Sequence, residues 1–113
     1  VGVIEGRTAI EAITRDSGHL ALVAAGVAHM SSPPYIIIEG DQAVATCHTM
    51  VPMHGENGFF IGRLSASRIK LGRQPDGSWK ISHRQNWILD GGKEGPAMLG
   101  RLKEGARKSD ISC

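Results

Sequence analysis

Apolar and polar residues alternate along the middle of the chain with the period of two that is typical of strands. Residues 35–39, 41–54, 59–71 and 79–89 show this alternation or a β-branched and aromatic composition. Turn residues separate the four segments: Gly40 with Asp41, then residues 55–58, then residues 75–77. The pattern predicts consecutive strands joined by short turns, which is an antiparallel meander.

The first quarter of the chain has helical spacing instead. Its apolar residues recur at intervals of three and four between residues 9 and 27, with a break at 16–18, so one broken helix or two short ones fit equally. Thr8 and Glu11 match a capping box and predict a helix from about Ala9. Pro96 suits the first turn of a second helical region near the other end of the sequence. The apolar positions of that region are Met98, Leu99, Leu102 and Ala106.

The predicted strand at residues 41–54 separates two sets of side chains. One set is even-numbered: Val44, Thr46, His48, Met50, Pro52 and His54. The other is odd-numbered: Ala43, Ala45, Cys47, Thr49 and Val51. We expect the even-numbered face to carry the polar chemistry and the odd-numbered face to pack.

Length and composition restrict the class of protein. At 113 residues the chain is one domain, and its net charge of +2 comes from scattered basic residues, which disfavours nucleic-acid binding. No apolar run approaches the roughly 20 residues that span a bilayer, and the sequence starts without a signal-peptide pattern. Cys47 and Cys113 lack the spacing of a redox or metal motif and indicate a reducing compartment. We therefore expect a cytoplasmic protein without membrane association.

Metal binding is disfavoured as well. The chain has five histidines, but none is paired at H-x-H or H-x-x-x-H spacing and no carboxylate cluster accompanies them. We expect no metal and no cofactor.

Two stretches carry a resemblance to a known superfamily. Residues 39–45, EGDQAVA, and residues 76–84, DGSWKISHR, resemble the SnoaL-like branch of the nuclear-transport-factor-like superfamily, and the likeness extends from about residue 6 to residue 90. The resemblance implies an α+β cone, in which a curved antiparallel sheet packs on one or two helices. Members of the superfamily have about two further helices and a strand before this segment, so we expect the single domain at residues 1–113 to be incomplete at its N-terminus.

Two enzyme families within that branch suggest site residues. The stretch HTMVPMH resembles a strand of the scytalone dehydratases, whose two active-site histidines fall on His29 and His54. The catalytic histidine of the hexachlorocyclohexane dehydrochlorinases also corresponds to His29, and an arginine of their last strand corresponds to Arg84. A serine and an asparagine of the dehydratases are replaced here by Ala66 and Arg68. Both families also hold an aspartate on a helix that lies before the point where this sequence starts.

These correspondences imply cofactor-free lyase chemistry of the dehydratase type, or isomerase chemistry, on a small hydrophobic or aromatic molecule. His29 would be the general base, and His54 and Arg84 would stabilise the developing charge from across an apolar pocket. Arg68 is a second candidate for binding an anionic group. The expected lining of the pocket is Met50, Pro52, Phe60, Leu64 and Ile88.

Other interpretations of the same residues remain open. His29 could instead cap a helix end, His48 is more typical of a core histidine, and the arginines could form ion pairs with Glu39 or Asp41. The competing function is a non-catalytic ligand-binding or oligomerisation module on the same fold. An apolar stripe opposite Arg84 predicts a homodimer or higher assembly through the sheet. Its residues are Trp79, Ile81, Trp87 and Leu89.

Overall fold

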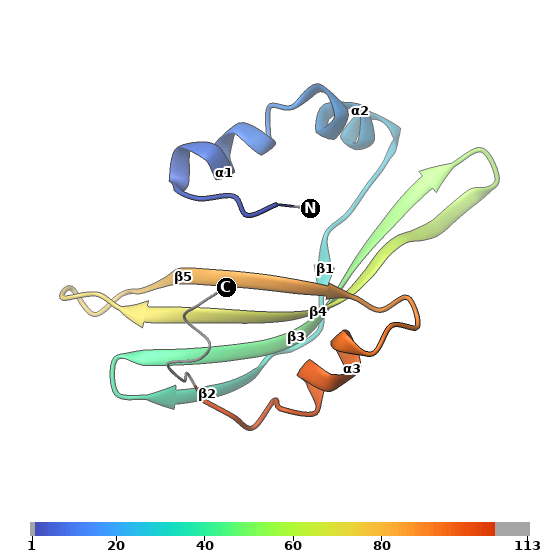
Figure 1. Ribbon diagram of the computed structural model, residues 1–113. Coiled ribbons are helices and arrows are strands. Elements are labelled where there is room, and N and C mark those ends of the chain that lie inside the picture. The colour runs from blue at the N-terminus through green and yellow to red at the C-terminus, as the bar shows by residue number, and fades with distance from the viewer. Residues whose placement is uncertain (1, 106–113) are drawn as a thin grey trace.

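One antiparallel sheet forms the centre of the molecule in the computed structural model, which describes residues 2–105 (Figure 1). In chain order the elements are α1 (Arg7–Ile13), α2 (Ser17–Ala25), β1 (Met30–Ser31), β2 (Tyr35–Glu39), β3 (Gln42–Gly55), β4 (Gly58–Arg73), β5 (Trp79–Ile88) and α3 (Glu94–Leu99). The strand order is β1-β3-β4-β5, and β2 also pairs with β3. The predicted meander is confirmed, and the short strand β1 is an addition to it.

The helical region before the sheet consists of two short helices. Asp16 begins α2 by accepting hydrogen bonds from the backbone N–H groups of Gly18 and His19 at 3.0 and 3.3 Å. The predicted capping box at Thr8 is wrong, because α1 begins after Gly6, which has no side chain to cap it. Neither α1 nor α2 has a buried residue, and neither has the length or hydropathy needed to cross a membrane, nor does α3. The predicted helical position Ala106 lies outside the described residues.

Two bulges interrupt the register of the sheet. Val51 pairs with Arg63 but Pro52 pairs with Ile61, so Gly62 is an extra residue in β4. A Cβ atom at Gly62 would lie 2.5 Å from the sulfur of Met53, and glycine therefore lets that side chain cross the strand. A second shift between Lys70 and Leu71 leaves Ser82 as the extra residue in β5.

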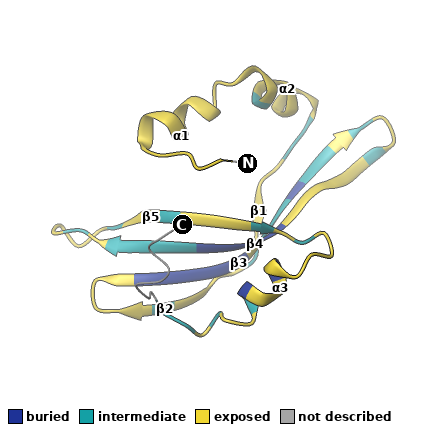
Figure 2. Cartoon of the chain, in the orientation of Figure 1, coloured by how far each residue is buried: buried dark blue, intermediate teal, exposed yellow. Residues whose placement is uncertain are grey.

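Buried apolar residues lie on both faces of β3. Ala43, Ala45, Cys47 and Val51 are buried on the odd-numbered face, which packs as expected. Val44 is buried on the even-numbered face, which α3 and the chain after it cover. Val44 and Met98 are each 1% exposed and Ala66 is fully buried. The buried segments belong to β3, β4 and α3 (Figure 2).

Arg68 is also buried, and its Nη2 donates to the backbone carbonyls of Glu104 and Gly105, which secures the chain after α3. The expectation that the even-numbered face carries the chemistry is thus wrong for the part of the sheet that α3 covers.

The predicted apolar stripe is divided between the two faces. Antiparallel partners project from the same face, so Ile81, opposite Leu71, shares the face of Arg84, which is opposite Ile69. Trp87 is opposite Ala66 and lies on the other face, near α3. The bulge at Ser82 is the cause, because one extra residue reverses the alternation.

The remaining predicted members of the stripe have partners within the chain. The guanidinium of Arg73 lies 4.8 Å from the centre of the Trp79 ring and also approaches Asp41 at 3.8 Å. The side chain of Leu89 would be 2.7 Å from a Cβ atom at Gly95 of α3. Assembly through the sheet stays a prediction. The continuous apolar stripe on which that prediction was based is not present on either face.

The turn between β4 and β5 is closed by Asp76. The side chain of Ser78 donates to the Asp76 carboxylate at 2.6 Å and its backbone N–H donates at 2.9 Å. These two bonds lower the pKa of Asp76 below its usual value, the side-chain bond contributing more. Gly77 follows with φ 85°, a conformation that glycine adopts without strain.

Truncation of the core should destabilise the protein strongly. Met98→Ala is expected to lower the free energy of unfolding by about 2–5 kcal/mol, because it leaves a cavity between α3 and the sheet. Met30→Ala is the matched control: Met30 is 53% exposed, and its loss should cost less than about 1 kcal/mol. Urea denaturation measures both, and equal effects would contradict this location of the core.

Candidate functional site

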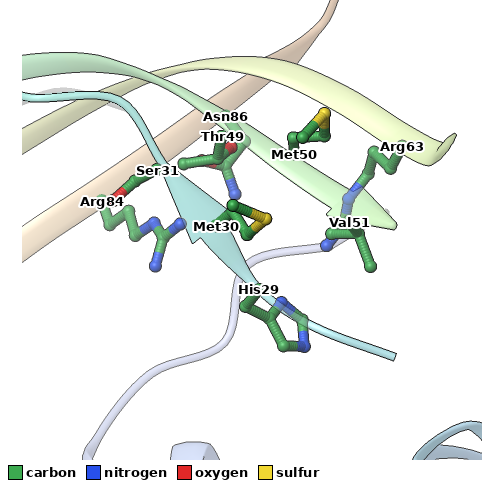
Figure 3. A pocket seen from close by; sticks show the side chains of 9 residues that line it. All are labelled: His29, Met30, Ser31, Thr49, Met50, Val51, Arg63, Arg84 and Asn86. Carbon is green, nitrogen blue, oxygen red and sulfur yellow. The ribbon is translucent and has the colours of Figure 1, made fainter. Parts of the chain in front are cut away.

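A hollow of about 220 Å³ lies mainly on the odd-numbered face of β3, the face that α3 does not cover. Four strands and the segment before β1 contribute to it (Figure 3). Its lining residues are His29, Met30, Ser31, Thr49, Met50, Val51, Arg63, Arg84 and Asn86.

His29 reaches the hollow because the segment after α2 runs along β3 as an extended chain. His54 donates its backbone N–H to the carbonyl of Gly26 at 2.9 Å, and Ala28 donates to the carbonyl of Pro52 at 3.1 Å. Continuing this register through the pair Met30 and Met50 places His29 beside Val51. Helix α2 has already ended at Ala25, so the alternative that His29 caps a helix is wrong. The His29 side chain is exposed, and its ring stacks on that of His19 with 6.4 Å between centroids.

His54 is not part of this hollow. It has the opposite parity from Val51 and Met53 along β3, so its side chain projects from the other face of the sheet. There it makes an edge-to-face contact with Phe59, with 5.0 Å between ring centroids. The expectation that His29 and His54 stand on opposite walls of one pocket is wrong.

A chain of side-chain hydrogen bonds fixes the floor of the hollow. Ser67, which is fully buried, donates its hydroxyl to Oδ1 of Asn86 at 2.5 Å, and lies 3.1 Å from the hydroxyl of Thr49. Because the Ser67 proton is given to Asn86, Thr49 acts as donor in the other bond. Oδ1 of Asn86 is thereby occupied, and its amide N–H groups remain available at the hollow.

Two guanidinium groups line the same hollow, those of Arg63 and Arg84. No aspartate or glutamate is among the described residues that line it, and within residues 2–105 neither arginine makes an ion pair. Arg84 was predicted from the resemblance, but Arg63 was missed. The pairing of Arg63 with Val51 places it at the same level of the sheet as His29, with β3 between them, and the alternation of residues 63, 65 and 67 along β4 was the available signal.

The predicted apolar lining is distributed over the sheet. Met50 borders the hollow, and Leu64 joins Met50 and His48 around a second hollow of about 230 Å³. Half-buried Pro52 and the exposed Phe60 and Ile88 line neither of them. The pocket predicted from these residues together with Arg68 is therefore not formed as expected.

His48 is exposed and borders the second hollow, so the assignment as a core histidine is wrong. Its backbone N–H donates to the hydroxyl of Ser32 at 2.9 Å.

In the described part of the chain, no three His, Cys, Asp or Glu side chains are grouped so as to hold a metal ion.

The curved antiparallel sheet, with helices on both sides and a polar hollow on one face, defines a cone of the nuclear-transport-factor-like class. The chain belongs to the SnoaL-like domain family, whose sequence model matches residues 1–85. Both the fold class and the family predicted from the sequence are thus confirmed.

Solved structures agree with this assignment. A nuclear-transport-factor-like protein with a cystatin-like fold from Novosphingobium aromaticivorans is 37% identical over 88% of this chain, with a TM-score of 0.82. A Catenulispora acidiphila protein in complex with S-DNPA has 23% identity over 74% of this chain and a TM-score of 0.57. A Mycobacterium tuberculosis protein of unknown function has 19% identity over 75% and a TM-score of 0.54. These last two likenesses concern the fold alone.

The chain spans 64% of the length of the Novosphingobium protein and 60% of each of the other two. No curated protein shows significant sequence similarity to it.

Loss of the Ser67 hydroxyl should loosen the floor of the hollow. Ser67→Ala is expected to cost about 1–3 kcal/mol, because it leaves partly buried groups of Thr49 and Asn86 without their partner. Ser17→Ala on exposed helix α2 is the control and should change stability by less than about 0.5 kcal/mol. Urea denaturation measures the stability, and the NMR signals of the Asn86 side-chain amide should shift in the first variant only. An unchanged Asn86 signal in Ser67→Ala would contradict the network.

Proposed function

We propose that the hollow binds a small hydrophobic or aromatic molecule and that His29 removes a proton from it, in cofactor-free isomerase or lyase chemistry. The observation that carries this proposal is that His29 and Arg84 line the same hollow, although they are far apart in the sequence. Met30, Met50 and Val51 offer apolar surface to the rest of such a ligand.

The polar groups suit proton abstraction beside a carbonyl. A nitrogen of the His29 imidazole accepts the proton from carbon, and the C–H electron pair moves to the carbonyl oxygen to form an enolate. The guanidinium of Arg84 and the amide of Asn86 are donors for that oxygen. The Asn86 amide is fixed in advance by the bond to Ser67, and such a donor stabilises charge that develops in the transition state.

The enolate has two outcomes that conserve atoms and charge. Return of the proton from His29 to another carbon completes an isomerisation. Alternatively, the electron pair expels a hydroxyl from the neighbouring carbon, and the proton on His29 joins it to leave as water, which is a dehydration. His29 returns to its neutral form in both cases.

A non-catalytic ligand-binding role is the second candidate, and one observation favours it. His29 is exposed, and none of the described residues of the hollow is a carboxylate that could orient its ring. An imidazole without such a partner is less well fixed for catalysis, whereas the hollow itself can still bind a ligand.

The test is exchange of the α-protons of aromatic ketones such as 2-tetralone in deuterated buffer, followed by NMR. The protein should accelerate exchange over buffer, and His29→Ala should lose about 10²–10⁴-fold of that acceleration, which is the usual contribution of a general base. His54→Ala should keep the rate, because its ring lies on the other face of the sheet. Equal exchange with the wild-type protein and with His29→Ala would exclude the base. Ligand-induced shifts without exchange would support the binding module.

A further inference from the structure

We propose that the ligand of this hollow is an aromatic oxo acid, with a carboxylate held by Arg63 and a carbonyl oxygen facing Arg84. This inference rests on the proposed function and names the substrate class of the same site.

The charge of the hollow is the first argument. A neutral ketone develops one negative charge on reaction, and Arg84 with Asn86 is sufficient to stabilise it. Arg63 then adds a second positive charge to the same hollow, with no acidic residue among the described lining residues. Two positive charges without an acidic neighbour give the hollow a positive potential, which attracts a ligand with a permanent anionic group. The planar guanidinium of arginine suits a carboxylate in particular, because it donates two parallel hydrogen bonds.

The arrangement of the three side chains is the second argument. In Figure 3, Arg84 and Arg63 lie toward opposite ends of the group, and His29 lies below them. The register places His29 and Arg63 at the same level of the sheet, since both adjoin Val51. Arg63 extends from β4 beside Val51, whereas Arg84 extends from β5, two residues from Asn86 along the same strand. A ligand whose carbonyl is near Arg84 and whose carboxylate is near Arg63 therefore presents the carbon atoms between these groups to His29. Those carbons include the one whose proton the neighbouring carbonyl acidifies.

The apolar residues define the remaining part of the ligand. Met30 and Met50 border both this hollow and the second one, where Leu64 adds further apolar surface. An aryl group attached to the carbonyl can contact this surface, since methionine sulfur packs favourably against aromatic rings. The chemistry that recognises the ligand is thus an aryl ketone with a carboxylate a few carbons away.

The probe that fits this description is 4-oxo-4-phenylbutanoate, and its primary amide is the neutral counterpart of the same shape. Binding is measured by NMR titration to the His29→Ala protein, so that turnover plays no part. The carboxylate should bind at least about tenfold more tightly than the amide, as a charge-assisted bidentate pair predicts. The preference should fall as salt is raised, because the arginines are exposed.

Three variants in the same background assign the preference to one residue. Arg63→Gln should abolish the preference for the carboxylate, and Arg63→Lys should retain part of it because the charge is kept. Arg101→Gln removes one positive charge from an exposed position after α3, outside the hollow, and should leave the preference intact. An unchanged preference in Arg63→Gln would overturn the proposal, as would equal binding of acid and amide, or no binding of either at millimolar concentration. A folded NMR spectrum of each variant accompanies the titration.

The failure of this inference can be distinguished from failure of the proposed function. A carboxylate preference that depends on Arg63, together with no α-proton exchange by the wild-type protein, would leave the anion site standing and exclude the base. Exchange that depends on His29 but is equally fast for acid and amide would exclude the anion site only.

Discussion

The antiparallel pairing of β3 with β4 is the interaction on which the rest of the structure depends. These strands have 14 and 16 residues, and every other strand pairs with one of them. The same pairing aligns Thr49 and Ser67 on one face, and it aligns Val44 and Ala66 with the core on the other. A shift by one residue would exchange the two faces and bury the polar groups under α3. The register of this pairing thus decides which polar side chains face the hollow and which side chains lie on the face that α3 covers.

Much of the fold could be predicted from the sequence, because the relevant signals are local. Alternation identified β2 to β5 within about two residues of their ends, and Gly40, Pro75 and Gly77 marked the turns. Burial of the odd-numbered Ala43, Ala45, Cys47 and Val51 agrees with the expected packing of that face. Burial of the even-numbered Val44 and Thr46 could not be predicted in this way, because residues 94–105, far along the chain, cover that face. The bulges at Gly62 and Ser82 are equally hard to foresee, since the neighbouring strand determines which residue is extra.

The part of the candidate site that could be predicted consists of residues that a resemblance identifies one by one, without knowledge of how they lie in space. His29 and Arg84 were identified from a resemblance, which transfers individual positions without requiring their geometry. His54 and the apolar pocket residues required the faces of the sheet to be correct, and these predictions were wrong for that reason. Arg63 was missed because its alignment with His29 arises from two strands and a further segment: β4 pairs with β3, and β3 pairs with the segment before β1.

The polar side chains at the bottom of the hollow are held firmly, whereas the proposed general base, His29, lies on a short edge segment of the sheet. Thr49 and Asn86 are fixed through buried Ser67 at the centre of the sheet, so their positions have the stability of the β3–β4–β5 pairing. His29 depends instead on a few backbone bonds between residues 26–32 and β3, in which only Met30 and Ser31 count as strand. Edge segments of this kind open at a lower free energy than central strands. Substitutions at Ser67 should therefore affect folding as well as the site. Changes along residues 26–32 should instead move His29 with little effect on global stability. The Asn86 amide is accordingly preorganised for a ligand oxygen, and the position of His29 is the more adjustable part of the site.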